Sequence, residues 1–205
     1  MKLNICILTL KIDEKVHLDA NKVRGFIGNE FKEHSILHNH YGESNLYSYP
    51  LVQYKIINGD VVILAIEEGS DIINEITPQI KYLKVNKEYK VSEKILLQKE
   101  VDVKPSSEEK HYKFITPWIG LNQKNYAKFN NIHDWKEKKD FLNKIIVGNL
   151  LSMSKGLGIV VNKRLYAKSK LDIKQVKYKS VIMNAFVGEF KVHYDIPDCF
   201  AIGKG

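Results

Sequence analysis

The sequence has few cysteines and no long apolar run, and both scarcities exclude classes of protein. Its 205 residues include only Cys6 and Cys199, without a CxxC pair, so neither a disulfide framework nor a thiolate metal site is predicted. No apolar stretch reaches the roughly 18 residues of a membrane span. The apolar start MKLNICILTL lacks a following small-residue cleavage site, which argues against a signal peptide. We therefore expect a cytoplasmic protein with no membrane partner.

Motifs for covalent catalysis and for phosphate loops are also lacking. There is no GxSxG elbow, and Cys6 lies in an apolar stretch where a thiolate is disfavoured. The glycines of Lys155–Gly158 follow a predicted helix instead of opening one, which is typical of a helix C-cap. No cofactor is predicted.

Acidic residues are scarce in one half of the chain. The net charge is +8, but residues 1–103 carry 13 basic and 15 acidic residues, whereas residues 104–205 carry 19 and 9. Such a basic surface favours a polyanion, and interleaved Tyr166 and Tyr178 supply rings on which RNA bases could stack. The alternative is a solvated lysine face without a partner. The densest basic stretch contains Lys163, Arg164, Lys168, Lys170, Lys174, Lys177 and Lys179.

The apolar patterns of the first half predict two helices among four strands. Strands are expected over residues 2–12, 46–57, 61–66 and 82–103, with the second and third joined by the tight turn Asn58-Gly59. Helices are expected from the cap Asp19 to about His34, and over residues 70–80. This βαββαβ order is that of a ferredoxin-like domain, the architecture of the RNA-recognition motif.

The second half reads as a shortened copy of the same pattern. Residues 104–109, KPSSEE, are predicted to be a linker, followed by a strand over residues 111–119 and a long helix over residues 134–153. Residues 159–179 and 181–194 then predict a long basic hairpin. The fold class expected is α+β, with two tandem ferredoxin-like domains over residues 1–103 and 110–205.

Three of the seven histidines, His34, His38 and His40, lie within seven positions just beyond the first predicted helix. The imidazole pKa lies near neutrality, so one ring can act as base and another as acid. On RNA, the base would deprotonate a ribose 2′-hydroxyl for attack on the adjacent phosphorus, and the acid would protonate the departing 5′-oxygen. His38 and His40 are the predicted pair, and the products would be a 2′,3′-cyclic phosphate and a 5′-hydroxyl.

Charge that builds on the phosphate oxygens needs a donor nearby, and four side chains in this region could supply one. Two alternatives remain for the histidines: a three-histidine metal site, with Glu33 and Glu43 the carboxylates nearest in sequence, or surface histidines without a special role. No metal site is predicted. The four candidate donors are Tyr41, Tyr47, Tyr49 and Lys55.

Several segments together resemble the CRISPR-associated endoribonucleases that cut precursor CRISPR RNA within its repeats, most closely the type I-B group. They include VRGFIGNEF, the pair His38-Asn-His40, YPLVQYKIINGD, LAIEEGSDIINEI and the final FKVHYDIPDCFAIGKG. The family's glycine-rich loop matches Gly203, Lys204 and Gly205, although the family usually continues to a further glycine turn and a closing strand.

The resemblance implies two ferredoxin-like domains and metal-independent cleavage of repeat RNA that leaves cyclic phosphate ends. It also implies that His38 and His40 carry the chemistry and that residues 203–205 contact RNA. The partners expected are CRISPR repeat RNA and other subunits of a CRISPR effector complex, for a monomer or a homodimer. The alternative function is a non-catalytic RNA-binding subunit of such a complex.

Overall fold

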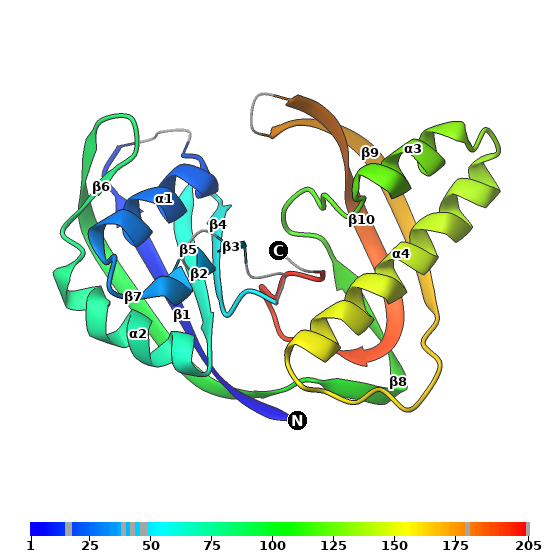
Figure 1. The fold of residues 1–205 in the computed structure, drawn as a ribbon, viewed down its shortest axis with the longest axis horizontal. Helices are drawn as coiled ribbons and strands as arrows, with labels where there is room; N and C mark the ends of the chain where they lie inside the picture. The colour runs from blue at the N-terminus through cyan, green and yellow to red at the C-terminus, as the bar shows by residue number, and fades with distance from the viewer. Residues whose placement is uncertain (15–17, 38–39, 42–43, 46–48, 179–180, 204–205) are drawn as a thin grey trace. The chain divides into compact units, whose positions relative to one another are not determined.

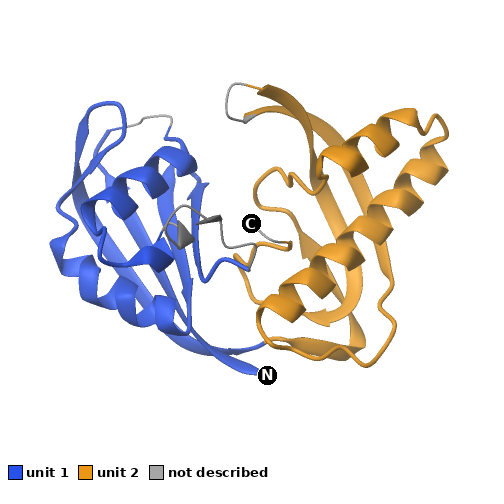
Figure 2. Ribbon diagram, in the orientation of Figure 1, with its two compact units in different colours: residues 1–102, 205 blue, residues 103–204 orange. Residues whose placement is uncertain are grey.

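The computed structural model describes residues 1–14, 18–37, 40–41, 44–45, 49–178 and 181–203, with the side chains of 40–41, 44–45 and 178 excepted. The chain divides into two compact units, unit 1 over residues 1–102 and unit 2 from residue 103 onward (Figure 2). Each is described here by itself. Both combine helices with an antiparallel sheet, so the predicted α+β class is confirmed.

Unit 1 is a five-stranded sheet with two α-helices on one face (Figure 1). The sheet order is β4-β5-β1-β7-β6, so its first four strands have the ferredoxin-like arrangement and β6 extends the edge. The elements are β1 Lys2–Ile12, α1 Ala20–Glu30, η1 Ser35–Leu37, β2 His40–Tyr41, β3 Ser44–Asn45, β4 Val52–Ile57, β5 Asp60–Ile66, α2 Glu68–Ile76, η2 Thr77–Gln79, β6 Tyr82–Lys84 and β7 Glu88–Asp102.

Local chemistry explains where these elements begin and turn. The Asp19 side chain accepts a hydrogen bond from the Asn21 amide at 2.8 Å, which caps α1 as predicted. Asn58 and Gly59 have φ values of 54° and 93°, the left-handed values that a two-residue hairpin requires. Alternate β1 residues such as Leu8 and Leu10 pack on the helices. Cys6 lies in the same buried cluster, and this burial raises the pKa of its thiol to about 11.

Several predicted boundaries in unit 1 were wrong. The strand expected from residue 46 begins at Val52, and the 82–103 stretch is a hairpin of β6 and β7. The helix expected over residues 70–80 is α2 followed by η2, because Pro78 cannot continue an α-helical hydrogen-bond ladder. Helix α1 ends at Glu30, short of His34, and the small β2–β3 pair was not predicted.

Unit 2 is a three-stranded sheet in the order β8-β10-β9, with two helices on one face (Figure 1). This order is that of the first three strands of a ferredoxin-like domain, so the predicted shortened copy is confirmed. The elements are β8 Lys104–Lys113, α3 Gln123–Asn131, α4 Trp135–Gly156, β9 Ala167–Tyr178 and β10 Val181–Asp195.

The linker predicted over residues 104–109 is wrong, because these residues form the first part of β8. Pro105 lies opposite Tyr194 in the ladder, and β8 is an edge strand, where a residue without an amide hydrogen is tolerated. The strand predicted over 111–119 therefore starts earlier and ends at Lys113. Residues 159–166 precede β9 without being strand, and helix α3 was not predicted.

Aromatic packing holds the helices of unit 2 on its sheet. Phe114 stacks on Trp118 with ring centroids 5.0 Å apart, and Phe129 of α3 meets Phe186 of β10 edge to face at 5.4 Å. The buried Ser154 and Tyr194 hydroxyls lie 2.6 Å apart and join α4 to the end of β10. These contacts leave the other face of the sheet uncovered by α3 and α4.

Gly188 in β10 is the position where this sheet should tolerate a side chain least. Its φ is +124°, and an added Cβ would lie 2.3 Å from the backbone oxygen of Lys170 on β9. Gly188→Ala should therefore lower the free energy of unfolding by about 3 kcal/mol or more, measured by urea titration. The matched control is Gly148→Ala in α4, where nothing lies within 4 Å of an added Cβ.

The control should raise the free energy of unfolding by about 0.5 to 1 kcal/mol, since alanine favours a helix interior over glycine. Equal effects of the two substitutions would contradict the close approach of β9 and β10.

Candidate functional site

The open face of the unit 2 sheet gathers cationic side chains from all three strands. Strand register puts Lys168 opposite Lys191, which in turn lies opposite His111 on β8. A second row joins Lys170, Glu189 and Lys113 in the same way. The alternation of strand residues directs these side chains away from the helix-covered core. We call Lys113, Lys168, Lys170, Lys174 and Lys191 the lysine face.

Carboxylates on the same face hold some of these cations in place. Glu109 Oε1 lies 3.3 Å from Lys168 Nζ, and its Oε2 lies 3.8 Å from Lys191 Nζ. His111 Nε2 lies 3.1 Å from Glu189 Oε2. Because the lysines are exposed, such pairs contribute little to stability and are readily exchanged for a phosphate.

The structure brings together only part of the predicted basic stretch. Lys168, Lys170 and Lys174 share the open face, whereas Lys177 falls on the opposite side of the hairpin by strand register. Lys163 and Arg164 precede β9, and the Arg164 guanidinium lies 5.2 Å from the ring centroid of Tyr166. Tyr166 is 63% exposed, so its ring remains open to stacking. Lys179 lies outside the described residues.

Sequence reasoning missed Lys113, Lys191 and His111 as members of this surface. Lys191 was within a predicted strand, but its alignment with Lys168 depends on a pairing register that alternation alone does not set. His111 and Lys113 likewise lay in the strand predicted over residues 111–119, but their alignment with β10 depends on the same kind of register. Alternation within that predicted strand puts the two side chains on one face, but it does not show which residues of another strand lie beside them.

The predicted histidine cluster lies after α1 in unit 1. His34 is 18% exposed, and its Nε2 lies 3.8 Å from carboxylate oxygens of both Glu33 and Glu75. The backbone of His40 pairs with Asn45 in the β2–β3 ladder, but its side chain is outside the described part of the structure. His38 also lies outside it. The assignment of His38 and His40 as catalytic residues therefore stays a prediction.

The four candidate donors near the histidines differ in what the structure describes. Tyr49 is only 3% exposed, so its ring belongs to the interior. Lys55 donates a hydrogen bond from Nζ to Gln53 Oε1 at 3.0 Å. Tyr41 pairs through its backbone with Ser44, and Tyr47 lies outside the described residues.

The glycine-rich end of the chain is described only to Gly203, so Lys204 and Gly205 lie outside it. Gly203 has a φ of +118°, and an added Cβ would lie 3.4 Å from Asn149 Cγ of α4. The backbone conformation favours glycine at this position, whereas the contact with α4 is an ordinary van der Waals distance. The predicted RNA contact of residues 203–205 stays a prediction.

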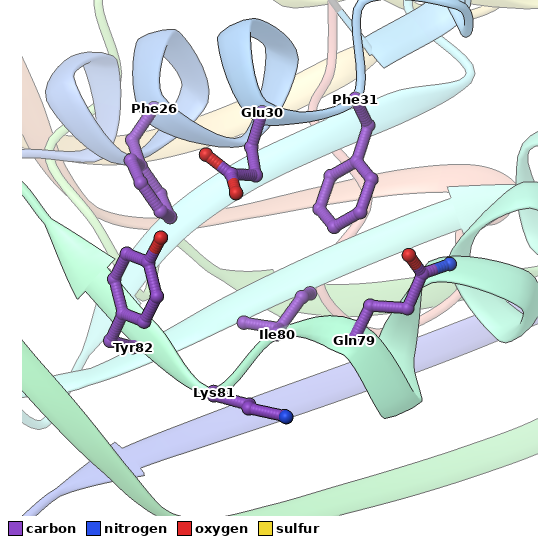
Figure 3. A pocket seen from close by; sticks show the side chains of 7 residues that line it. All are labelled: Phe26, Glu30, Phe31, Gln79, Ile80, Lys81 and Tyr82. Atoms are coloured by element: carbon purple, nitrogen blue, oxygen red, sulfur yellow. The ribbon is translucent and has the colours of Figure 1, made fainter.

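A small cavity in unit 1, which we call the dent, lies between α1 and β6 and is too small for a substrate. Its cavity volume of about 10 Å³ holds at most one water molecule. Figure 3 shows Glu30 directed toward the dent, Lys81 directed away from it, and the Tyr82 hydroxyl directed toward the ring of Phe26. The remaining lining residues are Phe31, Gln79 and Ile80.

Within the described ranges, no group of three histidine, cysteine, aspartate or glutamate side chains is arranged to hold a metal ion. The alternative three-histidine site depends on His38 and His40, whose side chains are outside those ranges, so it is not tested. No helix in the described part of the chain is long and apolar enough to cross a bilayer.

Comparison with known proteins connects both units to one family. Residues 1–102 match the family model of the Cas6b N-terminal domain, and residues 104–205 match that of the Cas6b C-terminal domain. An uncharacterized protein of Methanocaldococcus jannaschii is 46% identical over 95 residues, which are 45% of this chain and 63% of that protein. The chain thus spans less than two thirds of the length of this curated relative.

Two solved structures share the fold across the whole chain. One, the crystal structure of a Cas6b, is 30% identical with a TM-score of 0.90 and covers 100% of this chain and 95% of that chain. The other is named a CRISPR RNA processing endoribonuclease Cas6b, and it is 27% identical with a TM-score of 0.79. That match covers 100% of this chain and 94% of the solved chain. The two family models together span nearly all of the sequence, and the chain therefore belongs to the Cas6b family.

Proposed function

We propose that this chain is an endoribonuclease that cuts precursor CRISPR RNA within its repeats, without a metal. The observation that carries the proposal is the similarity over the whole chain to a solved CRISPR RNA processing endoribonuclease. Membership of the Cas6b family in both halves supports the same activity class. The lysine face adds a surface suited to RNA phosphates.

The proposed reaction uses the RNA's own 2′-hydroxyl as nucleophile. One imidazole of the His38 and His40 pair takes the hydroxyl proton while the 2′-oxygen bonds to the adjacent phosphorus. The bond from phosphorus to the 5′-oxygen breaks, and the other imidazole donates a proton to that oxygen. The products are a 2′,3′-cyclic phosphate and a 5′-hydroxyl. What supports this is the residue chemistry and the family resemblance of the histidine segment.

A cleavage assay on repeat RNA tests the function directly. The repeat of the CRISPR array adjoining the gene should be cut once, at an unchanged rate in excess EDTA, because the 2′-hydroxyl and two imidazoles leave no task for a metal ion. Polynucleotide kinase should phosphorylate the 5′ end of the downstream product directly, which would show that this end is a 5′-hydroxyl. Cleavage lost in EDTA and restored by zinc or magnesium would contradict the mechanism. Tight binding without cleavage would favour the non-catalytic subunit.

The lysine face should control affinity. Changing Lys168, Lys170 and Lys174 together to alanine should weaken repeat RNA binding and reduce its salt dependence. In a plot of log K against log salt concentration, the slope should fall by about one for each phosphate contact that is lost. Saturated single-turnover cleavage should persist. The matched control removes the same charge from the helix side of unit 2, through exposed Lys124, Lys128 and Lys139.

Filter binding at several salt concentrations distinguishes the two triple variants. An equal decrease of slope in both would show that RNA responds to net charge alone, and would contradict a specific role for the open face of the sheet.

A further inference from the structure

The chain that leads into the predicted catalytic histidines is anchored at Leu37. This residue ends the short turn η1, is 1% exposed, and packs into the core cluster of unit 1. Its amide donates a hydrogen bond to the His34 carbonyl at 3.1 Å, and the His34 amide donates to the Phe31 carbonyl at 3.1 Å. The path from the end of α1 to residue 37 is therefore defined by backbone bonds and by a buried side chain.

A side chain from the sheet completes this anchor. Tyr54 of β4 lies on the helix-covered face and donates its hydroxyl to the Leu37 carbonyl, with 3.4 Å between the oxygens. The last carbonyls of a helical turn lack partners within the turn, so an external donor stabilises them. Burial raises the pKa of Tyr54 above that of an ordinary phenol, and Arg24 lowers it in part. The hydroxyl therefore keeps its proton at any pH suitable for RNA cleavage.

The Leu37 carbonyl has a direct covalent link to the next residue. The carbonyl of residue 37 and the amide of residue 38 belong to one rigid peptide plane. A donor to the Leu37 carbonyl thus restrains the orientation of that peptide plane. Side chains used in catalysis must be held to within about half an ångström, and support from behind the site commonly does this.

We propose that Tyr54 is a positioning residue for RNA cleavage, which acts by holding the Leu37 peptide plane in front of His38. This inference rests on the proposed function, because it assigns Tyr54 to the same histidine site. Because the Tyr54 ring packs against the core of unit 1, we expect its effect on the chemical step and not on affinity.

The test compares Tyr54→Phe with Tyr82→Phe. Both variants keep the ring and remove one phenol oxygen from unit 1. The Tyr82 hydroxyl, however, is directed toward the ring of Phe26 (Figure 3), whereas the Tyr54 hydroxyl donates to the Leu37 carbonyl. Tyr54→Phe should lower the saturated single-turnover rate about tenfold and leave the RNA dissociation constant unchanged. Tyr82→Phe should change neither.

A double variant asks whether the effect passes through His38. In the His38→Ala background, Tyr54→Phe should slow cleavage no further, because the group that it positions is already absent. An equal slowing in both backgrounds would overturn the proposal, as would a wild-type rate for Tyr54→Phe alone.

NMR of the free protein separates this inference from the proposed function. The imidazole and amide resonances of His38 should shift in Tyr54→Phe and stay in place in Tyr82→Phe, whether or not repeat RNA is cut. If the resonances shift but the wild-type protein does not cut repeat RNA, the nuclease function is refuted, whereas the influence of Tyr54 on the backbone at Leu37 still holds. Unshifted resonances would overturn the positioning role itself.

Discussion

Alanine at His38 or at His40 is expected to slow saturated single-turnover cleavage of repeat RNA about a hundredfold or more. This is the usual scale for losing a general acid or base, and it corresponds to about 2.7 kcal/mol or more of activation free energy. The dissociation constant for the RNA should stay nearly unchanged, because the cations that we propose to meet phosphates lie in unit 2. Quench-flow cleavage and filter binding on the same preparations measure both quantities.

His133→Ala is the matched control, since this histidine is exposed in the turn between α3 and α4 and belongs to no predicted site. Its saturated rate should equal that of the wild type. Added imidazole should partly restore the His38 and His40 variants and leave the control unaffected. If both site variants cut at the wild-type rate, the histidines do not act in catalysis, and the RNA-binding subunit becomes the better assignment.

A single 2′-deoxyribose at the cut position is expected to abolish cleavage, because the proposed nucleophile is then absent. We expect the rate to fall by at least about a thousandfold, beyond the effect of either histidine variant. Binding should change by less than about threefold, since one hydroxyl contributes little beside many phosphate contacts.

The matched substrate carries the same change one nucleotide downstream, where the 2′-hydroxyl is no nucleophile in this mechanism. That RNA should be cut at the normal rate. Cleavage of the first substrate at the cut position would instead require an activated water, and would contradict the cyclic phosphate route.

Strong local signals predicted the elements of the fold, whereas its boundaries required tertiary information. The Asp19 cap and the Asn58-Gly59 turn carry their geometry in their own residue types, so both were confirmed. Residues 104–109 look like a linker because they are polar. They are part of a strand because Lys104 and Pro105 pair with Asp195 and Tyr194 of β10, and no local pattern predicts partners about 90 residues away.

The candidate site was predictable in residue type but not in grouping. A high lysine density indicated a basic surface, but the grouping of Lys168 with Lys191 depends on the register of β9 against β10. The pairing of His34 with Glu75 brings together two distant segments of the chain, and no spacing in the sequence predicts it. The contact between Tyr54 and Leu37 is likewise a meeting of distant segments.

The strand order of unit 2 also has a consequence during synthesis of the chain. The central strand β10 is the last of its three strands to leave the ribosome, so β8 and β9 have no neighbour in the sheet until then. In unit 1, by contrast, the central strand β1 comes first and is ready to pair when β5 and β7 emerge. Unit 2 should therefore fold late and in one step, with β8 and β9 exposed to wrong pairing and to chaperones until residue 195 emerges.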